Sequence, residues 1–328
     1  MRISSLVHNR IVAVVSLVVA AAGLLPVASI SPAEAAGSPA ATVSGSGLFA
    51  IGERLVYDVD WNPPWYLFFL PPMEAGKATL SLAEGTQYQG RRALKIIFTA
   101  RSSGTLTKMA GITIDDYYEF TTDAETFCTF CVTKREREGK RMRDIDLVYM
   151  PDRRQLHLRE VDVSTPVHRV LRDTDYDGIP PCVKDLFSAL YAVRQTNLEA
   201  GSLTRVLVGE NQTVKEVEVR VEKQERVSTP MGDYNAWRVN TIAVLGGLFK
   251  SGGQFRMWLS ADERRMPVKF EAKVSLGKVT GSLQEAHFGS WIAYFGFESR
   301  LLGRITCEFV GDKIHSPESE FSKRRRRP

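Results

Sequence analysis

The chain has 328 residues, of which 44% are hydrophobic and 25% are charged, as is usual for a globular protein. Its formal net charge is +5 at pH 7, but five adjacent cations at 323–327 account for this value. The rest of the chain is close to neutral. This argues against a nucleic-acid-binding domain, because such domains spread Lys and Arg over one face.

The N-terminus has the pattern of a secretory signal peptide. Two arginines precede an apolar run over 11–25, Pro26 ends that run, and 33–35 offers small residues to a signal peptidase. We therefore predict a signal peptide over 1–35 and export, to the periplasm or the extracellular medium. The alternative is an uncleaved membrane anchor, which the short run and Pro26 disfavour. Residues 36–50 are rich in small and polar residues and predict a flexible leader.

A strand-rich domain is predicted over 51–286. Apolar and polar residues alternate over 54–61, 216–222 and 268–276, which indicates an antiparallel sheet with one solvated face. Further strands are predicted over 76–83, 93–101, 113–121, 127–136, 143–150, 155–163, 203–208, 235–243, 253–260 and 278–285. A change of apolar phase between Leu158 and Val161 predicts a bulge or bend.

One amphipathic helix is predicted over about 182–195, after two prolines suited to a first helical turn. Its apolar face consists of Val183, Leu186, Phe187, Leu190 and Val193. The predicted fold class is mainly β (α+β), a strongly curved antiparallel sheet or half-barrel that wraps this helix on its concave face. Beyond the domain, 287–311 is predicted to be an apolar C-terminal extension and 312–328 a disordered basic tail.

Four cysteines, Cys128, Cys131, Cys182 and Cys307, can form disulfides if the protein is exported, and the sequence leaves all three pairings open. Cys128 and Cys131 form a C-x-x-C motif within a predicted strand. Residues three apart in a strand point to opposite faces. This favours a structural disulfide or two buried thiols over a redox or zinc site.

Four segments in this order resemble an uncharacterised family of exported bacterial proteins, domain of unknown function 3108. The segments are GERLVYDVDW (52–61), EAGKATL (74–80), IPPCVKDLFSALYAVR (179–194) and MWLSADERRMPVKF (257–270). The resemblance implies a single domain in which a curved sheet wraps a helix, similar to the half-barrels of periplasmic lipoprotein carriers. It implies no catalytic residues.

The loop over 61–73 is a proline-bounded apolar run where a polar turn is expected. It is predicted to be a membrane-touching tip, a partner-docking loop or a lid over an apolar cavity. The alternative is that it folds back and caps the open end of the sheet. The candidate ligand-binding residues are Trp61, Trp65, Tyr66, Phe68 and Phe69 in this loop, with Phe187 and Leu190 on the helix.

Asp173, Asp175 and Asp177 precede Gly178 in a D-x-D-x-D-G motif, which is a candidate calcium-binding turn. The twelfth position of such a loop should be Glu but is Lys184. The alternative is an acidic turn that leads into the helix, with Asp177 near the N-cap.

Two segments of the sequence are rich in basic residues, and both are predicted to lie on the surface. The run at 134–143 is a basic hairpin tip that could bind anionic polymers, but it is predicted to be two solvated strand ends, with Glu136 and Glu138 neutralising its cations. The tail at 323–327 is predicted either to touch anionic surfaces or to be a solvated end.

Motifs of common enzyme classes are absent from the sequence: it has no G-x-S-x-G, H-E-x-x-H, G-x-G-x-x-G or phosphate-binding loop. We therefore predict a non-enzymatic protein of the bacterial envelope. It is expected to bind or carry an apolar ligand, or a lipid-bearing partner, on the concave face of the sheet. The alternative is an envelope protein–protein interaction or assembly factor whose core is filled. If Phe187, Leu190, Val219, Phe270 and Val274 pack on one another, no room is left for a ligand, so a cavity among them would distinguish the two hypotheses.

Overall fold

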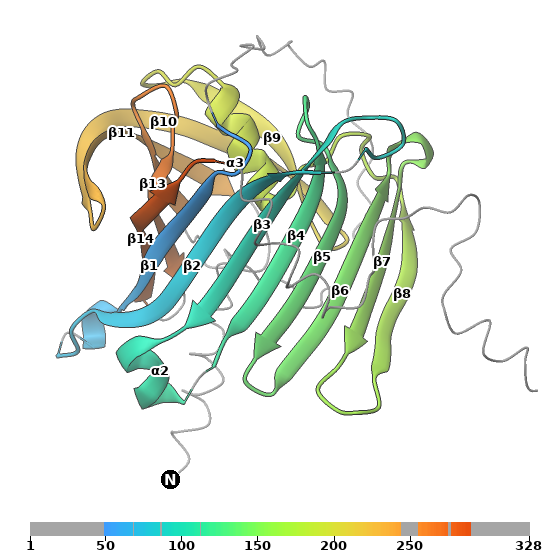
Figure 1. The fold of residues 1–328 in the computed structure, drawn as a ribbon, viewed down its shortest axis with the longest axis horizontal. Helices are drawn as coiled ribbons and strands as arrows, with labels where there is room; N and C mark the ends of the chain where they lie inside the picture. The colour runs from blue at the N-terminus through green and yellow to red at the C-terminus, as the bar shows by residue number, and fades with distance from the viewer. Residues whose placement is uncertain are drawn as a thin grey trace, which may run out of the picture. The chain divides into compact units, whose positions relative to one another are not determined.

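The alternating segments form fourteen strands among the residues that the computed structural model describes (Figure 1). Those residues are 49–289, apart from 68, 86, 112, 244–254 and 275–276. They fall within one compact unit, 1–290, and a second unit, 291–328, lies outside them. The predicted signal peptide, C-terminal tail and Cys307 also lie outside the described residues.

The strands are β1 (Arg54–Asn62), β2 (Met73–Glu84), β3 (Ala93–Ser102), β4 (Asp115–Asp123), β5 (Thr129–Glu138), β6 (Arg141–Met150), β7 (Gln155–Asp162), β8 (Arg169–Asp177), β9 (Leu203–Glu210), β10 (Thr213–Thr229), β11 (Gly232–Ala243), β12 (Phe255–Ser260), β13 (Pro267–Val274) and β14 (Gly277–His287). The helical segments are η2 (Trp65–Leu67), α2 (Gly104–Ala110), η3 (Pro151–Arg153) and α3 (Leu186–Gln195). No helix among these is long and apolar enough to span a membrane.

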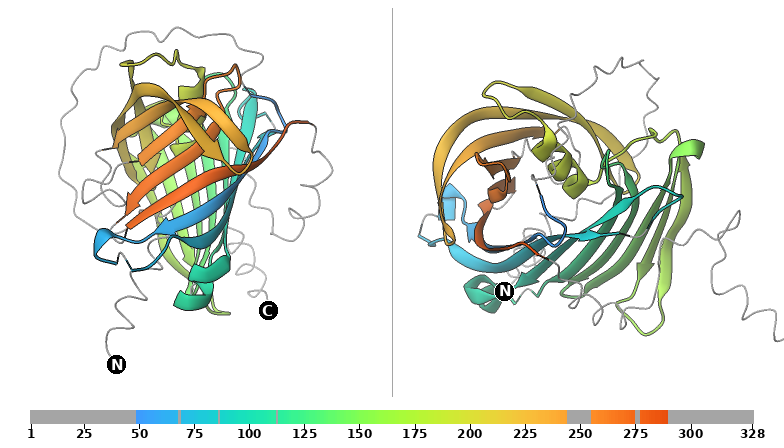
Figure 2. Two further views of the ribbon diagram at one scale, coloured as in Figure 1. Left: turned by 90° about the vertical axis from the view of Figure 1, so that its left-hand side faces the viewer. Right: turned by 45° about the horizontal axis from the view of Figure 1, so that its top comes forward.

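All fourteen strands belong to one antiparallel sheet, in the order β8-β7-β6-β5-β4-β3-β2-β1-β14-β13-β12-β11-β10-β9. The first strand, β1, therefore lies inside the sheet, between β2 and β14. The sheet is strongly curved and not closed, and α3 lies within its curve (Figure 2). The predicted fold class is confirmed.

The strand predictions overlap thirteen of the strands and miss β8. Both faces of β8 are largely solvent-exposed, so it has no apolar alternation to detect. The predicted irregularity is confirmed, because the pairing of β7 with β8 shifts register between Glu160 and Val161. The short helix α2 was also not predicted.

The core consists of two hydrophobic clusters that meet at α3. Phe187 and Tyr191 belong to the larger cluster, with residues of β1–β7. Ala189 and Val193 belong to the smaller cluster, with valines of β9–β11, and Leu190 packs against both. The helix therefore joins the two halves of the sheet by burying two sides of itself.

The helix begins four residues later than predicted, because Asp185 caps it. The Asp185 carboxylate accepts hydrogen bonds from the backbone N–H groups of Phe187 (2.8 Å) and Ser188 (2.9 Å), from the Ser188 hydroxyl, and from Thr129 Oγ1 (2.8 Å). The preceding Lys184 instead forms a parallel bridge with Val208 of β9. The prediction that Asp177 lies near the N-cap is wrong.

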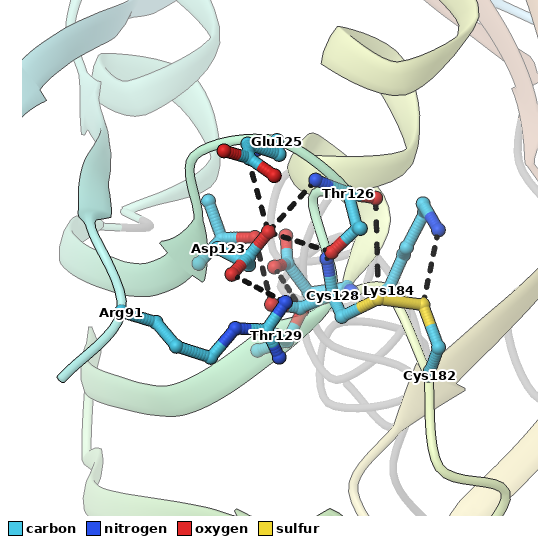
Figure 3. Close-up of a disulfide and its surroundings, with 10 residues drawn as sticks. Arg91, Asp123, Glu125, Thr126, Cys128, Thr129, Cys182 and Lys184 are labelled. Atoms are coloured by element: carbon cyan, nitrogen blue, oxygen red, sulfur yellow. Dashed lines mark hydrogen bonds and ion pairs between the residues drawn. A yellow bond between two sulfur atoms is a disulfide. The ribbon is translucent and has the colours of Figure 1, made fainter. Parts of the chain in front are cut away.

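A disulfide between Cys128 and Cys182 ties the start of β5 to the segment before α3 (Figure 3). This pairing means that the two cysteines of the C-x-x-C motif do not bridge each other. The turn before Cys128 is fixed by Asp123, whose Oδ1 accepts hydrogen bonds from the Thr126 N–H (2.8 Å) and hydroxyl (2.8 Å). Arg91 pairs with the other oxygen of Asp123 at 2.8 Å. The helix is therefore held covalently to a rigid turn.

A buried ion pair holds the other end of α3. Glu53 and Arg194 have no exposed side-chain surface, and two guanidinium nitrogens of Arg194 donate to the two Glu53 oxygens at 2.6 and 2.8 Å. The Tyr191 hydroxyl donates to Glu53 Oε1 at 2.9 Å. The guanidinium also lies over the rings of Tyr191 (4.8 Å) and Phe49 (5.3 Å). These contacts join the segments 52–61 and 179–194, two of the four family-like segments.

Candidate functional site

The candidate site is a pocket of about 100 Å³ where the two hydrophobic clusters meet beside α3. Its apolar walls are formed by Phe187, Ala189, Leu190 and Val193 of α3, Phe120, Val132, Leu147 and Tyr149 of β4–β6, Val206, Val208, Val217 and Val219 of β9–β10, and Phe255, Met257 and Ala272 of β12–β13. The site is thus built by two distant parts of the sheet and the helix between them.

A glycine allows one wall of the pocket to approach the next. A Cβ at Gly209 of β9 would lie 2.6 Å from Tyr149 Oη and 2.6 Å from Val183 Cγ1. Only a residue without a side chain lets β9 pass this close to β6 and to the segment before α3. The wall of the pocket on this side is therefore fixed by this close contact together with the backbone pairing of Lys184 with β9.

One end of the pocket carries polar groups. Lys134 of β5 lines the pocket, is 7% exposed, and donates from Nζ to Asn211 Oδ1 at 3.3 Å. Glu210 Oε1 lies 3.8 Å from the same ammonium. Asn211 adopts φ 48° in the turn between β9 and β10, a left-handed conformation that Asn tolerates better than most residues. Asp185, also in the wall, is engaged as the helix cap, and burial raises its pKa.

The structure brings two of the predicted ligand-binding residues to this pocket. Phe187 and Leu190 line it, as their place on the apolar helix face indicated. Val219, expected beside them, lines it too. Phe270, also expected there, packs against both clusters and does not line the pocket. The rest of the β9–β10 wall was not assigned to the site, because nothing local shows that these strands fold over β5.

The predicted loop aromatics lie elsewhere. Trp61 is buried in the larger cluster, whereas Trp65, Tyr66 and Phe69 are 86%, 48% and 67% exposed. Phe68 lies outside the described residues. The start of β1 is next to α3 through Glu53, so the far end of β1 carries the loop to the opposite ends of the strands, near α2 (Figure 1). The three exposed aromatics form a separate surface feature, the aromatic tip.

The acidic D-x-D-x-D-G motif is a strand rather than a turn, so both turn interpretations are wrong. Asp175 and Asp173 of β8 contact the His157 ring nitrogens at 2.8 and 3.3 Å, and Gln155 donates to Asp177 at 2.7 Å. Alternate residues in a strand lie about 6.6 Å apart, so the three aspartates are spread along β8. No group of three His, Cys, Asp or Glu residues in the described part of the chain is arranged to hold a metal ion.

The run at 134–143 is a hairpin with an exposed turn at 139–140, as predicted, but its β5 side is not solvated. Lys134, Glu136 and Glu138 alternate on the inner face of β5 and are all buried. Arg141 pairs with Glu136 and, at 2.9 Å, with Glu138. Asp116 of β4 is buried beside them. Sequence analysis missed this charged inner surface because polar alternation on a strand is usually read as its solvent face.

Comparison with known proteins gives one family and no assigned activity. The family model described as "Protein of unknown function (DUF3108)" matches residues 56–284. None of the curated proteins compared with the chain matches it.

Solved structures that resemble this chain include proteins from three bacteria. A β-barrel-like protein of domain of unknown function DUF1849 from Brucella abortus has 12% identity and a TM-score of 0.46; the match covers 74% of this chain and 100% of that chain. A candidate exported protein with a YmcC-like fold from Bacteroides fragilis has 12% identity and a TM-score of 0.29, with 73% and 97% covered. A candidate lipoprotein from Parabacteroides distasonis has 11% identity and a TM-score of 0.31, with 75% and 100% covered.

Proposed function

This chain belongs to the family of unknown function DUF3108, and from the geometry of its pocket we propose that it binds an apolar ligand in the bacterial envelope without transforming it. The observation that carries the proposal is the pocket itself, whose walls are apolar apart from one polar end. Pockets of this composition are typical of small-molecule sites. Against a filled core, the alternative hypothesis, stands the pocket that Phe187, Leu190 and Val219 line, although Leu190 also packs against both hydrophobic clusters.

The size of the pocket limits which ligands it can hold. Sites for whole drug-sized ligands have volumes of about 300–1,000 Å³, whereas a cavity of about 150 Å³ holds benzene. At about 100 Å³, this pocket takes a short stretch of one hydrocarbon chain. We therefore propose a ligand with a single chain, the rest of which extends out of the pocket.

The proposed location is the periplasm. The basic and apolar start of the chain supports export, and so does the Cys128–Cys182 disulfide, since disulfides persist in oxidising compartments. The proposal contains no chemical step, because the buried Asp185 in the wall serves as the helix cap. It also includes no nucleic-acid partner, given the near-neutral charge outside the tail.

Filling the pocket should abolish ligand binding. Ala189→Phe adds a ring to the pocket wall, so the affinity for octanoic-acid-sized ligands should fall at least tenfold, as measured by calorimetry on delipidated protein. Ala200→Phe, the same change at an exposed turn position, is the matched control and should leave affinity unchanged. Val219→Leu, a milder filling change, should act in the same direction if Ala189→Phe perturbs folding.

Native mass spectrometry with organic extraction of protein from the periplasm gives the independent test. A co-purifying single-chain molecule is the expected result. A protein that is clean on extraction, and that binds no apolar compound saturably, would contradict the proposed function.

The aromatic tip supports a second function, docking of a protein partner in the envelope. The backbone of the tip is tied down by local contacts: the Leu67 N–H donates to Pro64 O at 2.8 Å, the Leu70 N–H donates to Leu67 O at 2.9 Å, and Leu67 and Leu70 pack on the core. Trp65 and Phe69 are thereby held outward, and exposed aromatics of this kind often dominate the binding energy of interfaces.

The double variant Trp65→Ala/Phe69→Ala should lose partner cross-links in the periplasm while keeping its melting temperature and its ligand affinity. The reason is that the tip is exposed and lies away from the pocket. Lysine-reactive cross-linking followed by mass spectrometry makes the comparison. Unchanged cross-links would rule out docking of a partner through the tip. A loss of ligand affinity would instead indicate that the tip lies at the mouth of the pocket.

A further inference from the structure

Lys134 is an unusual wall residue for an apolar pocket. Its neighbours in the wall include Val132 and Leu147, and its side chain is nine-tenths buried. Lysine is seldom buried to this extent unless its charge is compensated, because moving an ammonium out of water is costly. The way in which Lys134 is paired therefore decides whether its role is structural.

The contacts of Lys134 use only part of its capacity. An ammonium group has three N–H donors. Among the described residues, one hydrogen bond runs to Asn211 at 3.3 Å, and the Glu210 carboxylate at 3.8 Å forms an ion pair that is too long to be a hydrogen bond. Unlike Asp185, which lines the same pocket and receives four hydrogen bonds, Lys134 keeps donors for a further acceptor.

We infer that the ligand of this pocket is a single-chain amphiphile with an anionic head group, bound at the head by Lys134. This inference rests on the proposed function and names its ligand class. A carboxylate or phosphate oxygen would complete the donors of the buried ammonium, and charge-assisted hydrogen bonds of this kind are stronger than neutral ones. The hydrocarbon chain would lie along α3, against Ala189 and Leu190.

The test compares head groups of equal chain length on the delipidated full-length mature protein. Octanoate, octyl phosphate, octanol and octylamine are titrated by calorimetry at pH 7.5. Octanoate, octyl phosphate or both should bind at least tenfold more tightly than octanol, which equals about 1.4 kcal/mol. The two anions distinguish a free fatty acid from a phosphate-bearing lipid as the source of the head group.

Variants of Lys134 test whether this residue causes the preference for anionic head groups. Lys134→Met should bind the anion and the alcohol equally, with alcohol affinity within about threefold of wild type, whereas Lys134→Arg should keep the preference. The matched control is Lys95→Met, which removes a lysine that pairs with Glu119 at 2.7 Å and does not line the pocket. It should change neither affinity.

The outcomes separate this inference from the function on which it rests. If the wild type binds none of the four compounds, the proposed function fails. If it binds octanol as tightly as both anions, or prefers octylamine, the pocket function stands and the inference is overturned. If Lys134→Met does not fold, the wild-type series and Lys134→Arg decide the question.

Discussion

Glu53→Gln should lower the free energy of unfolding by about 3 to 5 kcal/mol. The substitution leaves the Arg194 guanidinium as an uncompensated buried charge, and breaking a buried ion pair from one side typically has this cost. It also weakens the hydrogen bond from Tyr191 and loosens the end of α3. Urea unfolding followed by circular dichroism measures the change.

A surface pair provides the control for this prediction. Arg92 and Glu84 lie 3.7 Å apart with about two-thirds of each side chain exposed, so Glu84→Gln should cost at most about 1 kcal/mol. The double variant Glu53→Gln/Arg194→Met removes the orphaned charge and should be more stable than Glu53→Gln alone. A loss below 1 kcal/mol for Glu53→Gln would show that this pair does not anchor the helix.

Asp116→Asn should stabilise the protein by about 2 to 4 kcal/mol at pH 8 and change its stability little near pH 4. The pKa of Asp116 is raised to about 7, chiefly by burial. The Arg137 N–H, which donates to Asp116 Oδ1 at 2.8 Å, lowers this pKa. The nearby carboxylates of Glu138 and Glu136 raise it further. Each pKa unit corresponds to about 1.36 kcal/mol.

The direction of this pH dependence follows from the number of protons that the folded and unfolded states bind. Between about pH 4 and pH 7 the folded state holds a proton on Asp116 that the unfolded state has lost, so the contribution of this group to stability falls as the pH rises. Above pH 7 both states have lost the proton and the full cost is present. Asparagine carries no charge at any pH and avoids it.

Unfolding midpoints at pH 5, 6, 7 and 8 make the comparison. The control is Asp115→Asn, since Asp115 is exposed on the other face of β4 and pairs with Arg101 at 2.8 Å. That variant should keep the pH profile of the wild type. If Asp116→Asn also kept it, the buried carboxyl would not be the group that titrates.

The fold could be predicted where burial is one-sided. Strands such as β1, β10 and β13 place one face in the core, so their apolar residues alternate, and the amphipathic face of α3 shows in the same way. At the exposed edge, β8 has no such face and gave no signal. The start of α3 was misplaced because the two prolines suggested a first turn near 182, whereas Asp185 caps the helix through local hydrogen bonds from Phe187 and Ser188 and a long-range one from Thr129.

The site was predictable in its helical part and at Val219 of β10, but not in the rest of its sheet wall. Phe187 and Leu190 follow from the helix pattern, whereas the facing valines of β9 and β10 reach the pocket through the curvature of the whole sheet. The Glu53–Arg194 pair joins residues 141 positions apart, and the Lys134–Asn211 contact joins residues 77 apart. Charges with such long-range partners look like surface charges in a sequence.

The place of β1 inside the sheet sets the order of events during synthesis. β1 can pair with β2 at once, but its other neighbour, β14, is made last; Asn62 of β1 and Lys278 of β14, which face each other, are 216 positions apart. One long side of β1 therefore stays open while almost the whole domain is being produced. Such late, long-range pairing slows folding and exposes an unpaired edge to other chains, so we expect folding yield to depend on chaperones that hold the chain until β14 arrives.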